Sequence, residues 1–151
     1  MHKNNDMIKA IFIIILLLVV PSAEGKVTEP TAPASYAQAL KTANAFLWAW
    51  SNRDADSGTK LISQKLLAKL KKENREDWFR QYMTGLSNPH HLSFEIGKGK
   101  EINSKRFAFP VTLFEYYTGE PKAFQYKSKI EVIKEGDSWR INVLPTISDN
   151  E

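Results

Sequence analysis

The chain has 151 residues, of which 42% are hydrophobic and 25% are charged, and its formal net charge at pH 7 is +4. These values are ordinary for one globular domain and exclude a disordered, collagen-like or multi-span membrane chain. The sequence contains no cysteine. Disulfides, thiol catalysis, zinc sites built from thiolates and the acylated cysteine of a lipoprotein are therefore excluded.

The first 25 residues follow the order of features found in a secretory signal. A polar start with Lys3 and Lys9 leads into an apolar run over 8–20, and small residues follow up to Gly25. We expect a signal peptide over residues 1–25 and an exported, extracytoplasmic protein that is secreted or periplasmic. The alternative is an uncleaved membrane anchor, although the apolar run of about 13 residues is shorter than the ~20 that a membrane span needs.

The segment over 26–34 contains Pro30 and Pro33 and has no periodic apolar pattern, which predicts an extended linker. We expect the folded domain at 35–147 and a short tail at 148–151. Removal of the signal peptide takes away two basic and two acidic side chains, so the mild positive charge remains.

The domain is predicted to begin with an amphipathic helix. Ser35 is a candidate cap for it, and apolar residues then recur at steps of three and four up to Trp50. Trp48 lies away from this apolar stripe, so we expect it to pack elsewhere or to be partly exposed.

Two further helices are predicted. Residues 52–58 break the periodic pattern, which resumes in a second helix over 61–70 that can kink near Ser63. Asn74 offers a cap for a third helix, and Gly85 ends it.

After Asn88 and Pro89 the apolar residues alternate with polar ones, which is the pattern of strands. The alternating segments cover residues 92–96, 107–113, 124–132 and 139–143. Each strand has one apolar face, and the preceding helices are available to cover it. The sequence therefore predicts an α+β fold with three N-terminal helices packed on one face of a curved four-stranded antiparallel sheet.

The order of these elements resembles the nuclear-transport-factor-2-like (NTF2-like) superfamily, also described as a cystatin-like cone, over roughly Ser35 to Pro145. Two stretches carry the resemblance: Ala45-Phe46-Leu47-Trp48-Ala49-Trp50-Ser51-Asn52-Arg53-Asp54 and Gly136-Asp137-Ser138-Trp139-Arg140-Ile141. The resemblance implies an accessory or partner-binding module, as exported bacterial members often are. The superfamily also includes steroid isomerases, epoxide hydrolases and polyketide cyclases, which use a carboxylate or histidine inside the cone, so fold alone does not settle function.

Glu115 is the candidate catalytic carboxylate. It continues the alternating series Phe107, Phe109, Val111 and Leu113, so its side chain is predicted to point toward the buried face. A carboxylate in an apolar pocket can serve as a general base. The alternative is that the strand ends before this position and Glu115 is solvated at the rim.

No metal or cofactor is expected. His90 and His91 are adjacent, and in a strand their side chains would point to opposite faces, with no third ligand nearby. The sequence also lacks a glycine-rich phosphate loop, a nucleophile elbow and a His-Glu-x-x-His motif.

The densest basic stretch places Lys65, Lys69 and Lys72 on one helical face. This face could contact anionic lipid, a wall polymer or an acidic partner, and the alternative is an ordinary solvated face. Nucleic acid is not favoured, because no binding motif accompanies the charge.

Aromatic residues form a second candidate surface for a ligand or a partner. Its predicted members are Trp48, Tyr116, Tyr117 and Tyr126. The alternative is that they belong to the core.

These patterns favour an exported, non-enzymatic binding or assembly module of the cell envelope. One alternative is a small-molecule-binding or isomerase/lyase-type enzyme that uses the cone cavity, with Glu115 as its carboxylate. Another is a membrane-anchored subunit of an envelope complex, with the open face of the sheet as its interface and a route to oligomers.

Overall fold

The structure of the chain is a computed structural model, and it describes residues 33–85 and 89–147. The predicted signal peptide at 1–25, the linker up to residue 32 and the tail at 148–151 lie outside the described residues.

Helix α1 (Ala34–Ser51) confirms the first predicted helix. Its buried residues are Ala39, Ala43, Phe46, Leu47, Ala49 and Trp50. The predicted cap at Ser35 is wrong, because the Pro33 carbonyl already accepts a helical hydrogen bond from Ala37 N–H at 3.1 Å. The helix thus starts two residues earlier than a cap at Ser35 would place it, and Ser35 falls inside its first turn.

Within the described residues, four helices replace the three predicted ones, because the expected second helix is two separate helices. Helix α2 (Ala55–Leu61) ends before Ile62, and helix α3 (Gln64–Lys72) begins after Ser63. The extended backbone between them pairs with the sheet, where Ser63 N–H donates to the Ile141 carbonyl at 2.8 Å. The Ser63 hydroxyl in turn caps α3 by accepting from Leu66 N–H at 3.0 Å.

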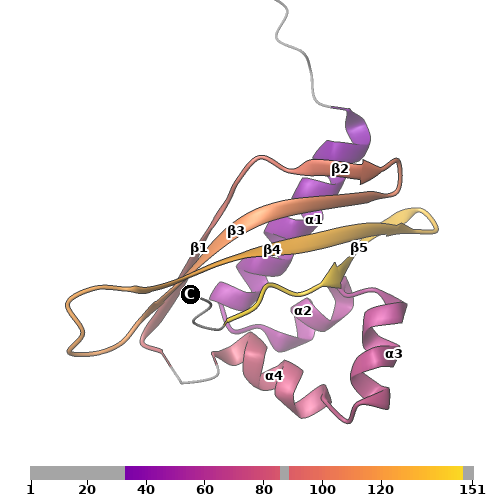
Figure 1. Cartoon of the computed structure of the whole chain (residues 1–151). Helices are drawn as coiled ribbons and strands as arrows, with labels where there is room; N and C mark the ends of the chain where they lie inside the picture. The colour runs from indigo at the N-terminus through magenta and orange to yellow at the C-terminus, as the bar shows by residue number, and fades with distance from the viewer. Residues whose placement is uncertain (1–32, 86–88, 148–151) are drawn as a thin grey trace, which may run out of the picture. The chain divides into compact units, whose positions relative to one another are not determined.

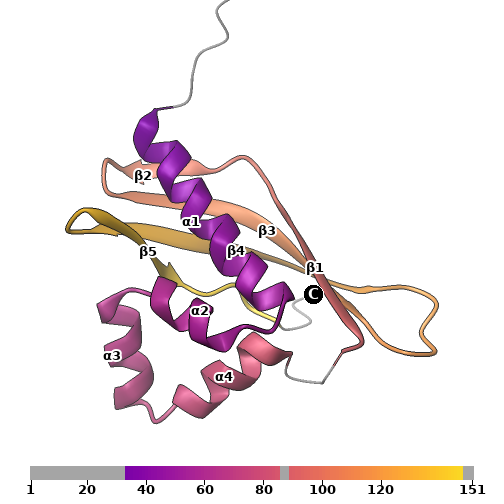
Figure 2. The ribbon, with the colours of Figure 1, turned by 180° about the vertical axis from the view of Figure 1, so that it is seen from behind.

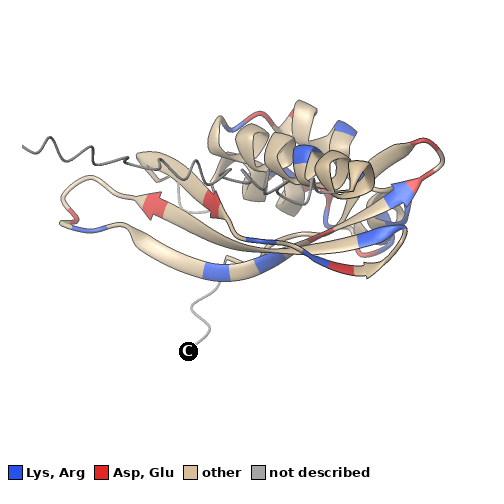
Figure 3. Cartoon of the chain, turned by 90° about the horizontal axis from the view of Figure 1, so that it is seen from above, with Lys and Arg blue, Asp and Glu red and all other residues tan. Residues whose placement is uncertain are grey.

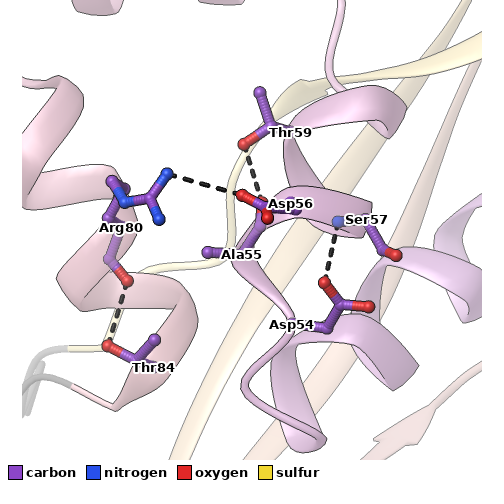
Figure 4. Close-up of polar contacts among 7 residues, drawn as sticks. All are labelled: Asp54, Ala55, Asp56, Ser57, Thr59, Arg80 and Thr84. Atoms are coloured by element: carbon purple, nitrogen blue, oxygen red, sulfur yellow. Dashed lines mark hydrogen bonds and ion pairs between the residues drawn. The ribbon is translucent and has the colours of Figure 1, made fainter.

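Residues 52–58, which break the periodic pattern in the sequence, include the first turn of α2. The Asp54 carboxylate caps this helix by accepting from Ser57 N–H at 2.9 Å (Figure 4). Helix α4 (Glu76–Thr84) is the third predicted helix, but its cap position is Arg75 and no side chain caps it. An exposed ion pair joins the Asp56 carboxylate of α2 to Arg80 of α4 at 3.5 Å (Figure 4).

The sheet is antiparallel and contains five strands within the described residues. They are β1 (His91–Ile96), β2 (Lys100–Asn103), β3 (Arg106–Tyr116), β4 (Phe124–Glu135) and β5 (Ser138–Val143). The order is β1-β3-β4-β5, and β2 also pairs with β3, so β1 and β2 form one interrupted edge.

The sequence prediction missed β2, because its four residues are all exposed and carry no alternating apolar pattern. Residues 97–99 separate β2 from β1. Gly97 N–H donates to the Pro110 carbonyl at 2.8 Å, and a Cβ atom at Gly99 would lie 2.4 Å from the ring of Phe109. Glycine at position 99 lets the edge pass directly over that buried ring.

The helices lie on one face of the curled sheet, and α1 runs diagonally across it (Figures 1 and 2). The α1 residue Tyr36 packs on Phe107 and Phe109 of β3, with ring centroids 5.7 and 5.5 Å apart. Trp139 of β5 packs on Phe107 at 5.4 Å and donates its indole N–H to Gln38 of α1 at 3.1 Å. The opposite face has no described helix on it (Figure 3), so the fold provides one covered face and one open face.

Candidate functional site

Glu115 lies in the interior, on the covered face of β3. The strand remains paired on both sides at this position, with Leu92 of β1 and Phe124 of β4. The side chain is therefore held at the inner face, and only 2% of the residue is exposed. This is the direction that strand alternation predicts, and the alternative of a solvated rim position is wrong.

Two tyrosine hydroxyls enclose the Glu115 carboxylate. Tyr117 donates to Oε2 at 2.9 Å, and Tyr126 donates to the same oxygen at 3.3 Å. The other oxygen, Oε1, is buried and has no hydrogen-bond partner among the described residues. The carboxylate thus has hydroxyl partners on one oxygen, which is a weaker set of partners than a cation would provide.

Tyr82 of α4 belongs to the same interior. Its residue is 1% exposed, and its hydroxyl has no partner within the described part of the chain. Burial, and secondly the charge of Glu115, raises the pKa of Tyr82 above its ordinary value. Helix α4 therefore places a neutral phenol within electrostatic reach of the buried carboxylate.

A surface hollow of about 530 Å³ lies between α3, α4 and the segment that follows β5. We call it the basic hollow. Its lining residues are Lys65, Leu66, Lys69, Leu70, Glu73, Arg75, Trp78, Tyr82, Asn142, Val143, Leu144, Pro145, Thr146 and Ile147. Tyr82 lines it, whereas Glu115 does not, so the basic hollow and the interior carboxylate are separate candidate sites.

The basic hollow brings together two of the three predicted lysines. Lys65 and Lys69 line it, whereas Lys72 does not. Arg75 belongs to the same basic stretch of the sequence but was not among the predicted contact residues, and its guanidinium lies 4.0 Å from the ring centroid of Trp78. The spacing of three residues at the start of a helix was the available signal for that pair.

Cations outnumber acids in the lining of the basic hollow. Glu73 is the acidic member, and its carboxylate lies 4.0 Å from Lys69 Nζ and 3.7 Å from the Arg75 guanidinium. One carboxylate is thus shared between two cations, and Lys65 has no ion pair among the described residues. The hollow keeps an excess of positive charge at its rim.

The four predicted aromatic residues do not form one surface. Trp48 is 57% exposed and packs edge-on against Phe94 of β1, with centroids 6.0 Å apart. Tyr116 is 40% exposed and packs beside His91. Tyr117 and Tyr126 instead hold Glu115, so the predicted group divides into exposed rings and carboxylate partners.

Within residues 33–85 and 89–147, no group of three or more histidine, aspartate or glutamate side chains could hold a metal ion. No helix in these ranges is long and apolar enough to cross a bilayer.

Comparison with solved structures defines the class of fold. The chain is similar to a domain of unknown function with a cystatin-like fold from Nostoc punctiforme PCC 73102, with a TM-score of 0.55, 12% identity, and coverage of 73% of this chain and 75% of that one. It is similar to a provisionally named scytalone dehydratase from Novosphingobium aromaticivorans DSM 12444, with a TM-score of 0.52, 10% identity, and coverage of 76% and 87%. A provisionally named NTF2-like dehydratase from Streptomyces avermitilis gives a TM-score of 0.51, 12% identity, and coverage of 76% and 97%. At these identities the likeness shows the NTF2-like fold alone.

The family model described as "NTF2-like N-terminal transpeptidase domain" matches residues 38–147. The chain belongs to this family, and the resemblance to the NTF2-like superfamily is confirmed. No protein with a curated function matched the chain.

Proposed function

We propose that this chain is an exported, non-enzymatic binding or assembly module of the cell envelope, and that the basic hollow is its binding site for an anionic partner. The family description names an N-terminal domain of transpeptidases. A domain placed beside another activity suits a role in binding or assembly. Export rests on the predicted signal peptide at 1–25.

The observation that carries the proposal is the enclosure of Glu115. A general base must reach the proton that it removes, whereas Glu115 is 2% exposed and is held by Tyr117 and Tyr126. Its neighbours across the ladder are Leu92 and Phe124, and Phe107, Phe109 and Trp139 fill the covered face toward the other end of β3. This packing counts against the enzyme alternative, and the likeness to proteins named as dehydratases extends to the fold alone.

The position of Lys65 and Lys69 supports an anionic partner. Both are exposed on α3 at the rim of a concave site, and Arg75 belongs to the same lining. Concave sites lined by one sign of charge attract the opposite sign more strongly than flat surfaces do. If residues 1–25 remain as an anchor instead, the open face of the sheet is the alternative interface.

Cosedimentation with washed envelope fragments tests the proposal on the chain purified from an exporting cell. Lys65→Glu/Lys69→Glu should weaken binding by about tenfold. Each reversal replaces an attraction with a repulsion and costs about 1 kcal/mol or less, and a total of about 1.4 kcal/mol corresponds to a tenfold loss of affinity. The matched control is Lys100→Glu/Lys105→Glu, which makes the same charge change at exposed residues at and after β2. Equal losses in both variants would contradict the proposed site, and a mature chain found only inside the cell would contradict export.

A further inference from the structure

The basic hollow combines an apolar interior with a cationic rim. Leu66, Leu70 and Tyr82 are all at least 92% buried and form its floor, while Val143 at the end of β5 and Leu144 after it contribute to the wall. Trp78 is half-buried and also lines the hollow. Apolar surface of this kind, in a concave site, favours a ligand with a hydrocarbon body.

The size and rigidity of the basic hollow fit a small ligand. Its volume of about 530 Å³ falls within the roughly 300–1,000 Å³ typical of small-molecule sites. The wall after β5 is fixed by hydrogen bonds, because Thr146 N–H donates to Ser128 Oγ at 2.8 Å and Ser63 Oγ donates to the Asn142 side chain at 3.0 Å. Because this wall is already ordered, ligand binding does not carry the entropic cost of ordering it.

The charges give the ligand an orientation. Lys65, Lys69 and Arg75 lie at the rim, where they attract an anion, and Glu73 neutralises only part of their charge. The floor, formed by Leu66, Leu70 and Tyr82, carries no charged side chain, so it favours an uncharged apolar group. An anionic head group is therefore favoured at the rim and a neutral apolar chain at the floor.

We propose that the basic hollow binds a small amphipathic anion: a single hydrocarbon chain that enters toward Tyr82 and ends in one anionic head group held by Lys65, Lys69 and Arg75. This inference rests on the proposed function and deepens it, since it names the class of ligand that the binding module takes. A free fatty-acid-like carboxylate is the simplest molecule with this chemistry.

Isothermal titration calorimetry with dodecanoate tests the inference on the chain purified from an exporting cell. We expect one saturable site, binding of dodecan-1-ol weaker by about tenfold because the head group loses its charge, and no measurable binding of butyrate because the chain is too short to fill the apolar floor. Equal binding of dodecanoate and dodecan-1-ol would overturn the role of the cationic rim.

Two variants locate the site. Lys65→Glu/Lys69→Glu should make dodecanoate bind no better than dodecan-1-ol, whereas Leu144→Trp should abolish binding of both by filling the hollow. Ile102→Trp, at an exposed position of β2, is the matched control for added aromatic surface and should leave both affinities unchanged. Should Leu144→Trp fail to fold by circular dichroism, Ile147→Trp fills the same hollow. Unchanged dodecanoate binding in a folded filled-hollow variant would overturn the inference.

The two proposals fail in different ways. If the lysine reversals abolish cosedimentation with the envelope but wild-type protein binds no dodecanoate, the hollow takes a larger anion and only the present inference is overturned. If neither binding is seen, both are overturned. Sedimentation velocity at the same concentrations tests a second copy of the chain as occupant, and a dimer that Leu144→Trp dissociates would overturn the inference in favour of that copy.

Discussion

Two acidic side chains of the sheet are almost completely buried, but on opposite faces. Glu115 of β3 is 2% exposed and points to the face that the helices cover. Glu131 of β4 is 5% exposed, and it pairs with Ala108 on the open face. The partners also differ, since Glu115 accepts from tyrosine hydroxyls while Glu131 is held by Arg106 and Lys129.

The difference teaches that burial has two origins in this sheet. Glu131 is covered by the side chains of its own cationic partners, with Arg106 Nε at 2.9 Å and Lys129 Nζ at 3.1 Å. Burial alone would raise the pKa of Glu131, but hydrogen bonds from Arg106 and Lys129 outweigh it, and the net pKa is lowered. Glu115 is covered by the packing of the helices on the sheet. If its carboxylate is removed, water cannot replace it as the acceptor for the hydroxyls of Tyr117 and Tyr126.

The largest effect is expected for Glu115→Ala. The substitution leaves the hydroxyls of Tyr117 and Tyr126 without their acceptor and opens a small cavity, so the free energy of unfolding should fall by about 3 kcal/mol. Urea denaturation measures the change. Glu115→Gln keeps the shape and one acceptor oxygen, and it should lose less than half as much. Equal losses in the two variants would show that the hydroxyls do not depend on this side chain.

A smaller effect is expected for Glu131→Gln. Arg106 and Lys129 are partly exposed and can be solvated when their acceptor loses its charge, so the loss at pH 7 should be about 1 kcal/mol. If Glu131→Gln lost as much stability as Glu115→Ala, the proposed difference between the open face and the covered face would be contradicted.

The pH dependence sharpens the same test. Since the folded-state pKa of Glu131 lies below its ordinary value of 4.5, its contribution is complete above that pH and is lost as the pH falls through the lower folded-state value. Wild type and Glu131→Gln should therefore converge in stability under acid conditions. Parallel curves from pH 7 down to acid unfolding would contradict the assignment.

The sequence predicts the direction of Glu115 but not its partners. Alternation in β3 is a local property, and it places the carboxylate on the covered face. The approach of Tyr126 depends on the register between β3 and β4, in which Tyr126 faces Leu113 and Phe124 faces Glu115. That register is set by the hairpin and by core packing, which local periodicity does not encode.

The basic hollow is likewise half predictable. The spacing of Lys65 and Lys69 places them on one helical face, whereas the opposite wall comes from residues 142–147, which are the end of β5 and the segment after it, where the apolar alternation stops. The division of the predicted second helix into α2 and α3 also could not be read from local periodicity. Its cause is the contact between Ser63 and Ile141, which are far apart in the chain.

The smallest effect is expected for Tyr82→Phe, which removes one buried hydroxyl from a residue that lines the basic hollow. The buried Tyr82 hydroxyl has no partner among the described residues, so its removal should change the free energy of unfolding at pH 7 by no more than about 0.5 kcal/mol. Because the folded-state pKa of Tyr82 is raised above its ordinary value of 10.0, the wild type loses stability once the pH exceeds that value and the unfolded chain ionises. Tyr82→Phe should show a shallower alkaline decline by the same denaturation assay. A loss well above 1 kcal/mol at pH 7 would mean instead that the Tyr82 hydroxyl is hydrogen-bonded in the interior. Its acceptor would then be Glu115 Oε1, the buried carboxylate oxygen that has no partner among the described residues.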